Sequence, residues 1–127
     1  MRISATTIAL TVDDVPASSG FLRGHFGFRE VAAADGFAKL IHEDAPEVVF
    51  LRRGTEVLPQ EHRDRRAGGV ILAFTVGDVP AEHERLTAAG VAITMPLRVD
   101  PWGERLFQVT DPNGVVIQLV DWVTPAD

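Results

Sequence analysis

The sequence contains no cysteine, which excludes disulfide bonds, thiolate metal ligands and a cysteine nucleophile together. No hydrophobic run approaches the roughly 20 residues of a membrane-spanning helix, and the N-terminus lacks the charged-then-apolar pattern of a signal peptide. Basic residues are also scarce, because 12 Lys and Arg stand against 18 Asp and Glu, a net charge of −6. This balance argues against a surface for nucleic-acid phosphates. We therefore expect a cytoplasmic protein with neither nucleic acid nor membrane as a partner.

What the chain does have is an internal repeat. Residues 8–17 return as residues 72–81, an offset of 64 in a chain of 127, and seven of the ten positions are identical. A fixed period predicts two similar modules. Each module of about sixty residues buries too little surface to be comfortably stable alone. We expect the two modules to complete one domain, with a ligand site in the concavity between them.

Local signals predict the same β-α-β-β-β order in both modules. In the first, alternating Ile, Thr and Val predict a strand over 3–12. Asp13, Asp14 and Pro16 then favour a helix to about His25, which Gly27 ends. Asp35-Gly36 and Asp111-Pro112-Asn113-Gly114 are typical turn sequences. The remaining predicted elements are strands over 28–34, 36–43, 47–53, 69–76, 91–98, 104–110 and 114–122, and a helix from Pro80 to Ala89 closed by Gly90.

These elements predict an α+β fold of two tandem βαβββ modules, about 1–54 and 68–123, joined by a linker over 55–67. The helices should cover one face of a curved, cup-like mixed sheet. Strand alternation places Ile8, Leu10 and Val12 beneath the first helix. The opposite face carries the small residues Thr7, Ala9 and Thr11, and small side chains leave room for a ligand.

The repeat and the ending Trp102-Gly103, Phe107, Asp111-Pro112-Asn113-Gly114 and Gln118-Leu119 resemble the vicinal oxygen chelate superfamily. This superfamily includes glyoxalase I, extradiol dioxygenases, fosfomycin-resistance enzymes and bleomycin-resistance proteins. In its metal-dependent members, His or Glu occupies four strand positions that face the cavity. The resemblance places those positions at Thr7, Phe50, Ile71 and Gln118.

None of these four residues is a good ligand for a divalent ion. A register error of one residue brings no better ligand, because the neighbouring positions are apolar: Ile8, Val49, Leu51, Val70, Leu72, Ile117 and Leu119. The four histidines (His25, His42, His62 and His83) share no ligand spacing. We therefore expect no metal and no other cofactor, as in the metal-free bleomycin-resistance-like members.

Aromatic residues are the first candidates for ligand contact. Trp102, within a Pro101-Trp102-Gly103 segment that resembles bleomycin-resistance proteins, can stack on a planar ring or a cation, or pack the strand entrance. Phe50, Trp122 and Val120 are assigned by alternation to the concave face, where they contact a ligand or fill the core. Ile71 and Thr7 share that face.

Polar residues are the second group. Gln118 stands among apolar neighbours and needs a partner: Thr7, Thr11, water or a ligand. We place Arg52 on the concave side of its strand, near the rim, and Arg105 on the neighbouring strand. Either arginine attracts an anionic ligand or only solubilises the surface. Glu43 and Glu47 flank the fourth strand, where a carboxylate acts as a base or is simply solvated. The serines lack the strand-turn-helix setting of a nucleophile.

Three functions follow as hypotheses. The first is a metal-free protein that binds a small hydrophobic or aromatic compound, such as a toxin or antibiotic, and sequesters it. The second is a lyase, isomerase or dioxygenase of the same superfamily whose metal site is unrecognised or lost. The third is an accessory domain without a ligand. Exposed sheet edges and the resemblance to the resistance proteins predict a homodimer.

Overall fold

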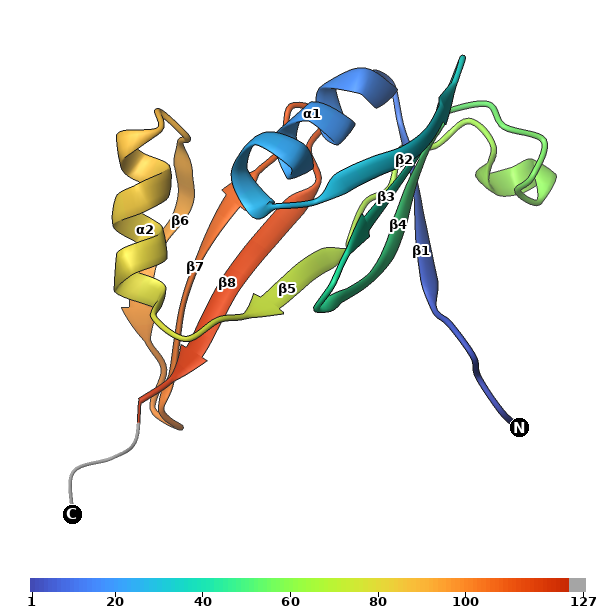
Figure 1. Cartoon of the computed structure of the whole chain (residues 1–127). Coiled ribbons are helices and arrows are strands. Elements are labelled where there is room, and N and C mark those ends of the chain that lie inside the picture. The colour runs from blue at the N-terminus through green and yellow to red at the C-terminus, as the bar shows by residue number, and fades with distance from the viewer. Residues whose placement is uncertain (124–127) are drawn as a thin grey trace. The chain divides into compact units, whose positions relative to one another are not determined.

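The structure of the chain is a computed structural model that describes residues 1–123. It divides into two compact units, a first unit from Met1 to Gly68 and a second unit that begins at Gly69. Each unit is a four-stranded mixed sheet with one helix packed on it (Figure 1). The two tandem βαβββ modules of an α+β fold are thus confirmed. None of the helices in the described part is long and apolar enough to cross a membrane.

The first unit starts its sheet later than predicted. Its elements are β1 (Thr7–Val12), α1 (Val15–Phe26), β2 (Arg29–Ala34), β3 (Phe37–His42), β4 (Ala45–Arg52) and the short 3-10 helix η1 (Gln60–His62). The strands lie in the order β1-β4-β3-β2, and β1 runs parallel to β4. Residues 3–6, predicted as strand, pair with no strand among residues 1–123, so β1 begins only at Thr7 opposite Glu47.

The second unit repeats this topology. Its elements are β5 (Ile71–Thr75), α2 (Val79–Ala88), β6 (Ile93–Val99), β7 (Glu104–Thr110) and β8 (Val116–Trp122). The strands lie in the order β5-β8-β7-β6, with β5 parallel to β8. In each unit, the chain between the two parallel strands forms the helix and the other two strands. Two parallel strands require a long crossover connection of this kind.

Both helices begin at an aspartate cap. The Asp14 carboxylate accepts a hydrogen bond from the Ala17 N–H (3.2 Å), and the Asp78 carboxylate accepts one from the Ala81 N–H (3.0 Å). Each cap satisfies a backbone donor that has no partner within its helix. The first helix ends at Gly27, whose φ of 72° is the left-handed conformation that favours glycine. The start and end of this helix are therefore local properties of the sequence.

Each core lies between a helix and one face of its sheet. Val15 and Leu22 of α1 and Val79 and Leu86 of α2 are buried. The largest fully buried sheet side chains are Val12, Leu40, Val48, Phe50, Phe107, Val109, Ile117 and Leu119. Helix and sheet are held together mainly by the removal of these apolar surfaces from water. The opposite face of each sheet is not covered by its helix, and we call it the open face.

Candidate functional site

Strand pairing decides which residues lie on the open face of the first unit. Thr7, Ala9 and Thr11 of β1 are paired with Glu47, Val49 and Leu51 of β4, so all six share that face. The alternation predicted for β1 is confirmed, because Leu10 and Val12 are buried on the side of α1.

The position predicted for Phe50 is wrong. Phe50 is paired with Leu10, not with a residue of the open face, and only 1% of it is exposed. It fills the core beneath α1. The reason is that Val48, Val49, Phe50 and Leu51 form an unbroken apolar run, which carries no alternation from which the facing of β4 can be read.

The observed register of β1 and β4 places Glu47 on the open face beside Thr7. The Thr7 hydroxyl donates a hydrogen bond to Glu47 Oε1 (2.9 Å), and Lys39 Nζ lies 3.5 Å from Glu47 Oε2. We call Thr7, Lys39 and Glu47 the Glu47 cluster. The sequence indicates only that Glu47 lies at a strand end, because the β1–β4 register that joins it to Thr7 links positions 40 residues apart.

The donor groups on the open faces do not fit a divalent metal. Three of the positions that the family resemblance indicates carry a hydroxyl (Thr7), an alkyl group (Ile71) and a neutral amide (Gln118), and the fourth, Phe50, lies in the core. On the open face of the first unit, Thr7 is paired with one carboxylate, that of Glu47. The charge of that single carboxylate is already balanced by Lys39. Within residues 1–123, no three His, Cys, Asp or Glu side chains are grouped closely enough to hold an ion. Divalent ions are bound by several such groups.

The open face of the second unit is as predicted. Ile71, Ala73 and Thr75 of β5 are paired with Val116, Gln118 and Val120 of β8, and Trp122 continues the same alternation. Ile71 is 52% exposed and Trp122 is 60% exposed, whereas Val120 is buried. This face is therefore largely apolar, with an exposed strand at its edge.

Gln118 has a hydrogen-bond partner that is not among those predicted from the sequence. Its Oε1 accepts a hydrogen bond from Gln108 Nε2 of the neighbouring strand β7 (3.0 Å). Thr11, one of the predicted partners, donates instead to the backbone carbonyl of Arg65 (2.7 Å). The amide N–H groups of Gln118 make no hydrogen bond to any described residue, so they stay available to a molecule on this face.

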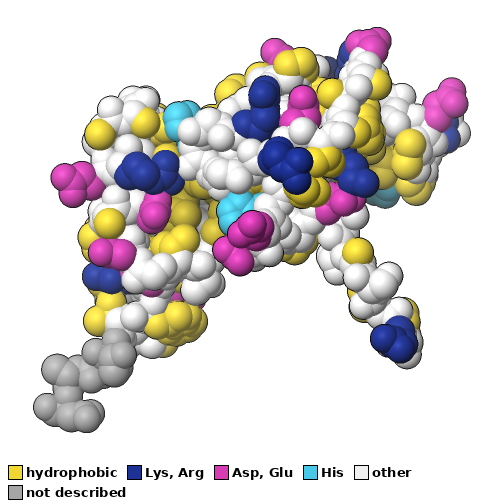
Figure 2. All heavy atoms as spheres, viewed as in Figure 1, with side chains coloured by type: hydrophobic (Ala, Val, Ile, Leu, Met, Phe, Trp, Pro, Cys, Tyr) yellow, Lys and Arg dark blue, Asp and Glu magenta, His cyan; other side chains and the backbone are white. Residues whose placement is uncertain are grey.

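Trp102 lies in the turn between β6 and β7, and 65% of it is exposed. The turn is tied to the end of β8, because Val123 N–H donates to the Gly103 carbonyl (2.8 Å) and Glu104 is paired with Trp122. Both tryptophans therefore belong to one end of the second sheet, which we call the tryptophan end. Hydrophobic side chains reach the surface there, where β8 ends (Figure 2).

Neither predicted arginine lies on an open face. Arg52 is paired with Val12, on the side of α1, and its guanidinium binds the carboxylate of Asp35. The hydrogen bond from Arg52, with its charge, lowers the pKa of Asp35. The placement of Arg52 near a concave rim is therefore wrong for the same reason as that of Phe50.

Arg105 is a structural residue. It lies opposite Asp121 and donates two hydrogen bonds to that buried carboxylate, Nε to Oδ1 (2.8 Å) and Nη2 to Oδ2 (2.7 Å). Asp121 Oδ2 also accepts the Val79 N–H at the start of α2 (2.8 Å). The hydrogen bonds from Arg105 lower the pKa of Asp121, against the raising effect of burial. We call these three residues the α2 latch.

Comparisons with known proteins agree with this topology. Residues 4–119 match the model of the Glyoxalase/Bleomycin resistance protein/Dioxygenase superfamily. No curated protein gives a significant match. A glyoxalase/bleomycin resistance protein/dioxygenase from Nocardioides is similar in structure, with a TM-score of 0.79, 21% identity and coverage of 100% of this chain and 88% of that one.

Two further solved structures are similar. A lactoylglutathione lyase from Agrobacterium tumefaciens has a TM-score of 0.72 and 20% identity, over 95% of this chain and 96% of its own. TioX from Micromonospora sp. ML1 also has a TM-score of 0.72, with 26% identity, over 95% of this chain and 100% of its own. At sequence identities this low, the comparison supports a shared fold, and the activity is argued from the residues of the site.

Proposed function

Since this chain belongs to the glyoxalase/bleomycin resistance protein/dioxygenase superfamily, we propose that it is a small-molecule-binding protein that works without a metal ion. It holds and sequesters a hydrophobic or aromatic compound, such as a toxin or an antibiotic. The donor groups described above support the metal-free part of the proposal, because one carboxylate paired with a lysine is a poor ligand set for a divalent ion.

The observation that carries the proposal is the open face of the second unit. Binding sites for small molecules are mostly apolar surfaces with a few polar groups that fix orientation. Here Ile71 and Trp122 supply exposed apolar area, and Gln118, held by Gln108, offers amide N–H donors. An indole such as that of Trp122 or Trp102 gains further energy by stacking on a planar or cationic ligand.

Tryptophan emission tests this proposal directly. The chain has two tryptophans and no tyrosine, so its intrinsic fluorescence comes from the tryptophan end alone. We expect a saturable change when the protein is titrated with a planar aromatic compound from a broad panel that includes bleomycin. The variants Trp102→Phe and Trp122→Phe assign the change to one indole, and Gln118→Ala weakens binding by about tenfold through the lost hydrogen bond. A panel without any saturable response contradicts the proposal.

A second candidate is an enzyme of the same superfamily, a lyase, isomerase or dioxygenase. The Glu47 cluster favours it, because a half-buried carboxylate beside a hydroxyl on an open sheet face can accept a proton from a substrate. Elemental analysis of the purified protein separates the candidates. A stoichiometric divalent metal that is lost in Glu47→Gln supports the enzyme and contradicts the metal-free proposal.

We also propose that two copies of the chain form a dimer. Within the described residues, β1 and β5 are edge strands, each hydrogen-bonded to a strand on one side only. Such edges favour pairing with another strand. Light scattering during size-exclusion chromatography distinguishes the mass of two chains, which we expect, from that of one 13.8 kDa chain.

A further inference from the structure

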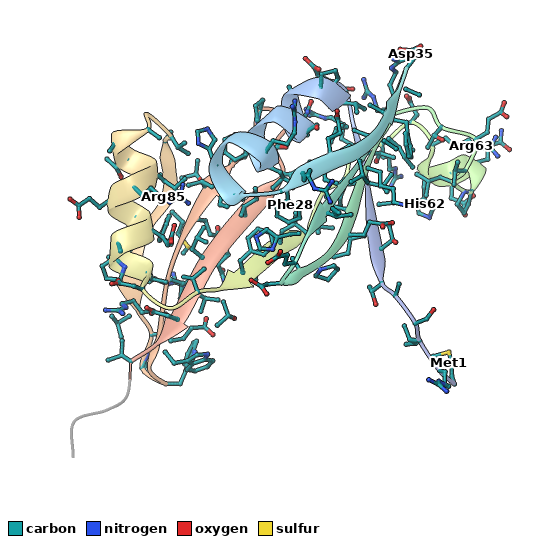
Figure 3. The ribbon with its side chains drawn as sticks, in the orientation of Figure 1. Met1, Phe28, Asp35, His62, Arg63 and Arg85 are labelled. Carbon is teal, nitrogen blue, oxygen red and sulfur yellow. The ribbon has the colours of Figure 1, made fainter. Side chains whose placement is uncertain are left out.

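The first unit has a groove on its helix side, away from the Glu47 cluster. The groove lies between α1 and the hairpin formed by β2 and β3, with Asp35 at the hairpin tip (Figure 3). Its volume is about 360 Å³, within the size range of small-molecule sites. All of its walls come from α1, from strands of the first sheet and from the Asp35-Gly36 turn between β2 and β3.

Small residues make this groove hollow. Ala33 of β2 is paired with Ala38 of β3, and both line the groove beside Pro16 of α1. The second unit is different at this point, because the offset of 64 places Leu97 of β6 where β2 has Ala33. The small residue at this position is therefore particular to the first unit.

The groove contains one cation without a partner. Arg52 is bound to Asp35, and Glu30 accepts a hydrogen bond from the Ser19 hydroxyl (2.8 Å). Arg23, on α1, lines the groove and makes no hydrogen bond or ion pair with any residue from 1 to 123. At the same offset α2 carries the neutral Thr87. The unmatched cation is thus also particular to the first unit.

We propose that this groove binds a small monocarboxylic acid with an apolar body. The carboxylate accepts hydrogen bonds from the Arg23 guanidinium, whose planar donors match its two oxygens. The apolar body lies against Ala33, Ala38 and Pro16. Glu30 and Asp35 line the same groove, so a multiply charged anion such as phosphate is repelled where a single carboxylate is accepted.

Amide chemical shifts of the ¹⁵N-labelled full chain test the site with three matched probes. Phenylacetate, phenylacetamide and phenethylamine share a phenyl body and differ in charge. We expect phenylacetate to shift the backbone N–H signals of Arg23, Ala33 and Gly36 with a Kd on the order of 1 mM. The neutral and cationic probes should bind at least about tenfold more weakly, because neither supplies an anion to the guanidinium.

Two variants and one control assign the contact. Arg23→Gln should weaken phenylacetate binding by about tenfold. Ala33→Leu, which copies the residue of the second unit, should block it by filling the groove. Arg29→Gln removes the same charge from β2, but Arg29 is paired with Ile41 on the other face, so binding should be unchanged.

Three outcomes overturn the site: no shifts at about 20 mM phenylacetate, shifts centred on Thr7 and Glu47, or equal losses in Arg23→Gln and Arg29→Gln. The failure of this site is distinguishable from that of the proposed function, because the proposed function is tested by the emission of Trp102 and Trp122, which both belong to the second unit.

Discussion

Phe50 is the residue whose substitution best separates packing from ligand contact. It is almost fully buried on the helix side of the first sheet, so Phe50→Ala should lower the free energy of unfolding by about 3–5 kcal/mol. Trp122→Ala, at a side chain that is 60% exposed, should cost less than about 1 kcal/mol. Urea denaturation measures both values. A cost for Phe50→Ala no larger than that for Trp122→Ala contradicts the placement of Phe50 in the core.

At this scale, the sequence predicted facing correctly only where apolar and polar residues alternate. Gln118 interrupts the apolar residues of β8, so its side of the strand could be read from the pattern. Phe50 lies in an unbroken apolar run, which does not show which residues face the helix. Arg52 lies two residues further along the same strand, so it was assigned to the wrong face with Phe50. Arg105 is committed to Asp121 through a cross-strand pair, and such pairs depend on a register that no local pattern contains.

At the scale of elements, the α2 latch couples the start of a helix to the last strand. Asp121→Asn keeps the side-chain size but removes the charge that Arg105 and the Val79 N–H share. Breaking a buried ion pair is strongly destabilising, so we expect the free energy of unfolding at pH 7 to fall by roughly 2–4 kcal/mol. Thermal or urea denaturation measures this loss. Arg85→Gln, on the exposed side of α2, is the matched control and should change stability by less than about 0.5 kcal/mol.

The latch also predicts a pH dependence. Because the pKa of Asp121 is lower in the folded protein than in the unfolded chain, its contribution is complete above the unfolded value of about 4. The contribution is lost as the pH falls from that value through the lowered folded pKa. The stability difference between wild type and Asp121→Asn should therefore be constant from pH 5 to 7 and shrink below about pH 4. A difference that grows in acid contradicts this prediction.

The turn at the tryptophan end needs a glycine. Gly103 has a φ of 93°, and a Cβ built on it would lie 3.0 Å from the Val123 carbonyl oxygen. Gly103→Ala should therefore destabilise the protein by about 1–2 kcal/mol and alter the emission of the adjacent Trp102. Gly77→Ala, where a Cβ meets no atom within 4 Å, should change neither property by a comparable amount. Equal effects of the two substitutions would show that the turn is not under this constraint.

Turns and helix ends were the elements most completely predicted from sequence. In the Asp111–Gly114 turn, the Asp111 carboxylate accepts the N–H groups of Asn113 and Val115, both at 2.8 Å, and Gly114 has a φ of 88°. These contacts span at most four residues, so the residues that make them are adjacent in the sequence. The start of β1 could not be predicted in this way, because residues 3–6 continue the alternating pattern of β1 but pair with no strand in the described part of the chain.

At the scale of the whole molecule, duplication produced two units with different chemistry. The same topology carries a carboxylate cluster on the open face of the first unit and an apolar, tryptophan-bearing face on the second. The repeat predicted the shared backbone. It did not predict the groove between α1 and the β2–β3 hairpin, because that groove depends on positions where the two copies differ. These positions are Ala33 against Leu97 and Arg23 against Thr87.

The proposal for the whole molecule also predicts its response to chelation. Dialysis against EDTA should leave the unfolding transition unchanged, since no side-chain set in the described residues fits a divalent ion. Differential scanning calorimetry before and after dialysis measures this. A fall in Tm that is restored by added Zn²⁺ or Mn²⁺ contradicts a metal-free fold.

Fluorescence titration of the chelator-treated protein with the aromatic panel is the most direct test of ligand binding without a metal ion. We predict a saturable change in tryptophan emission without any added metal, reduced in Trp122→Phe and unchanged when a divalent ion is supplied. Ligand binding that appears only after a divalent ion is added, and that disappears in Glu47→Gln, would contradict binding without a metal ion.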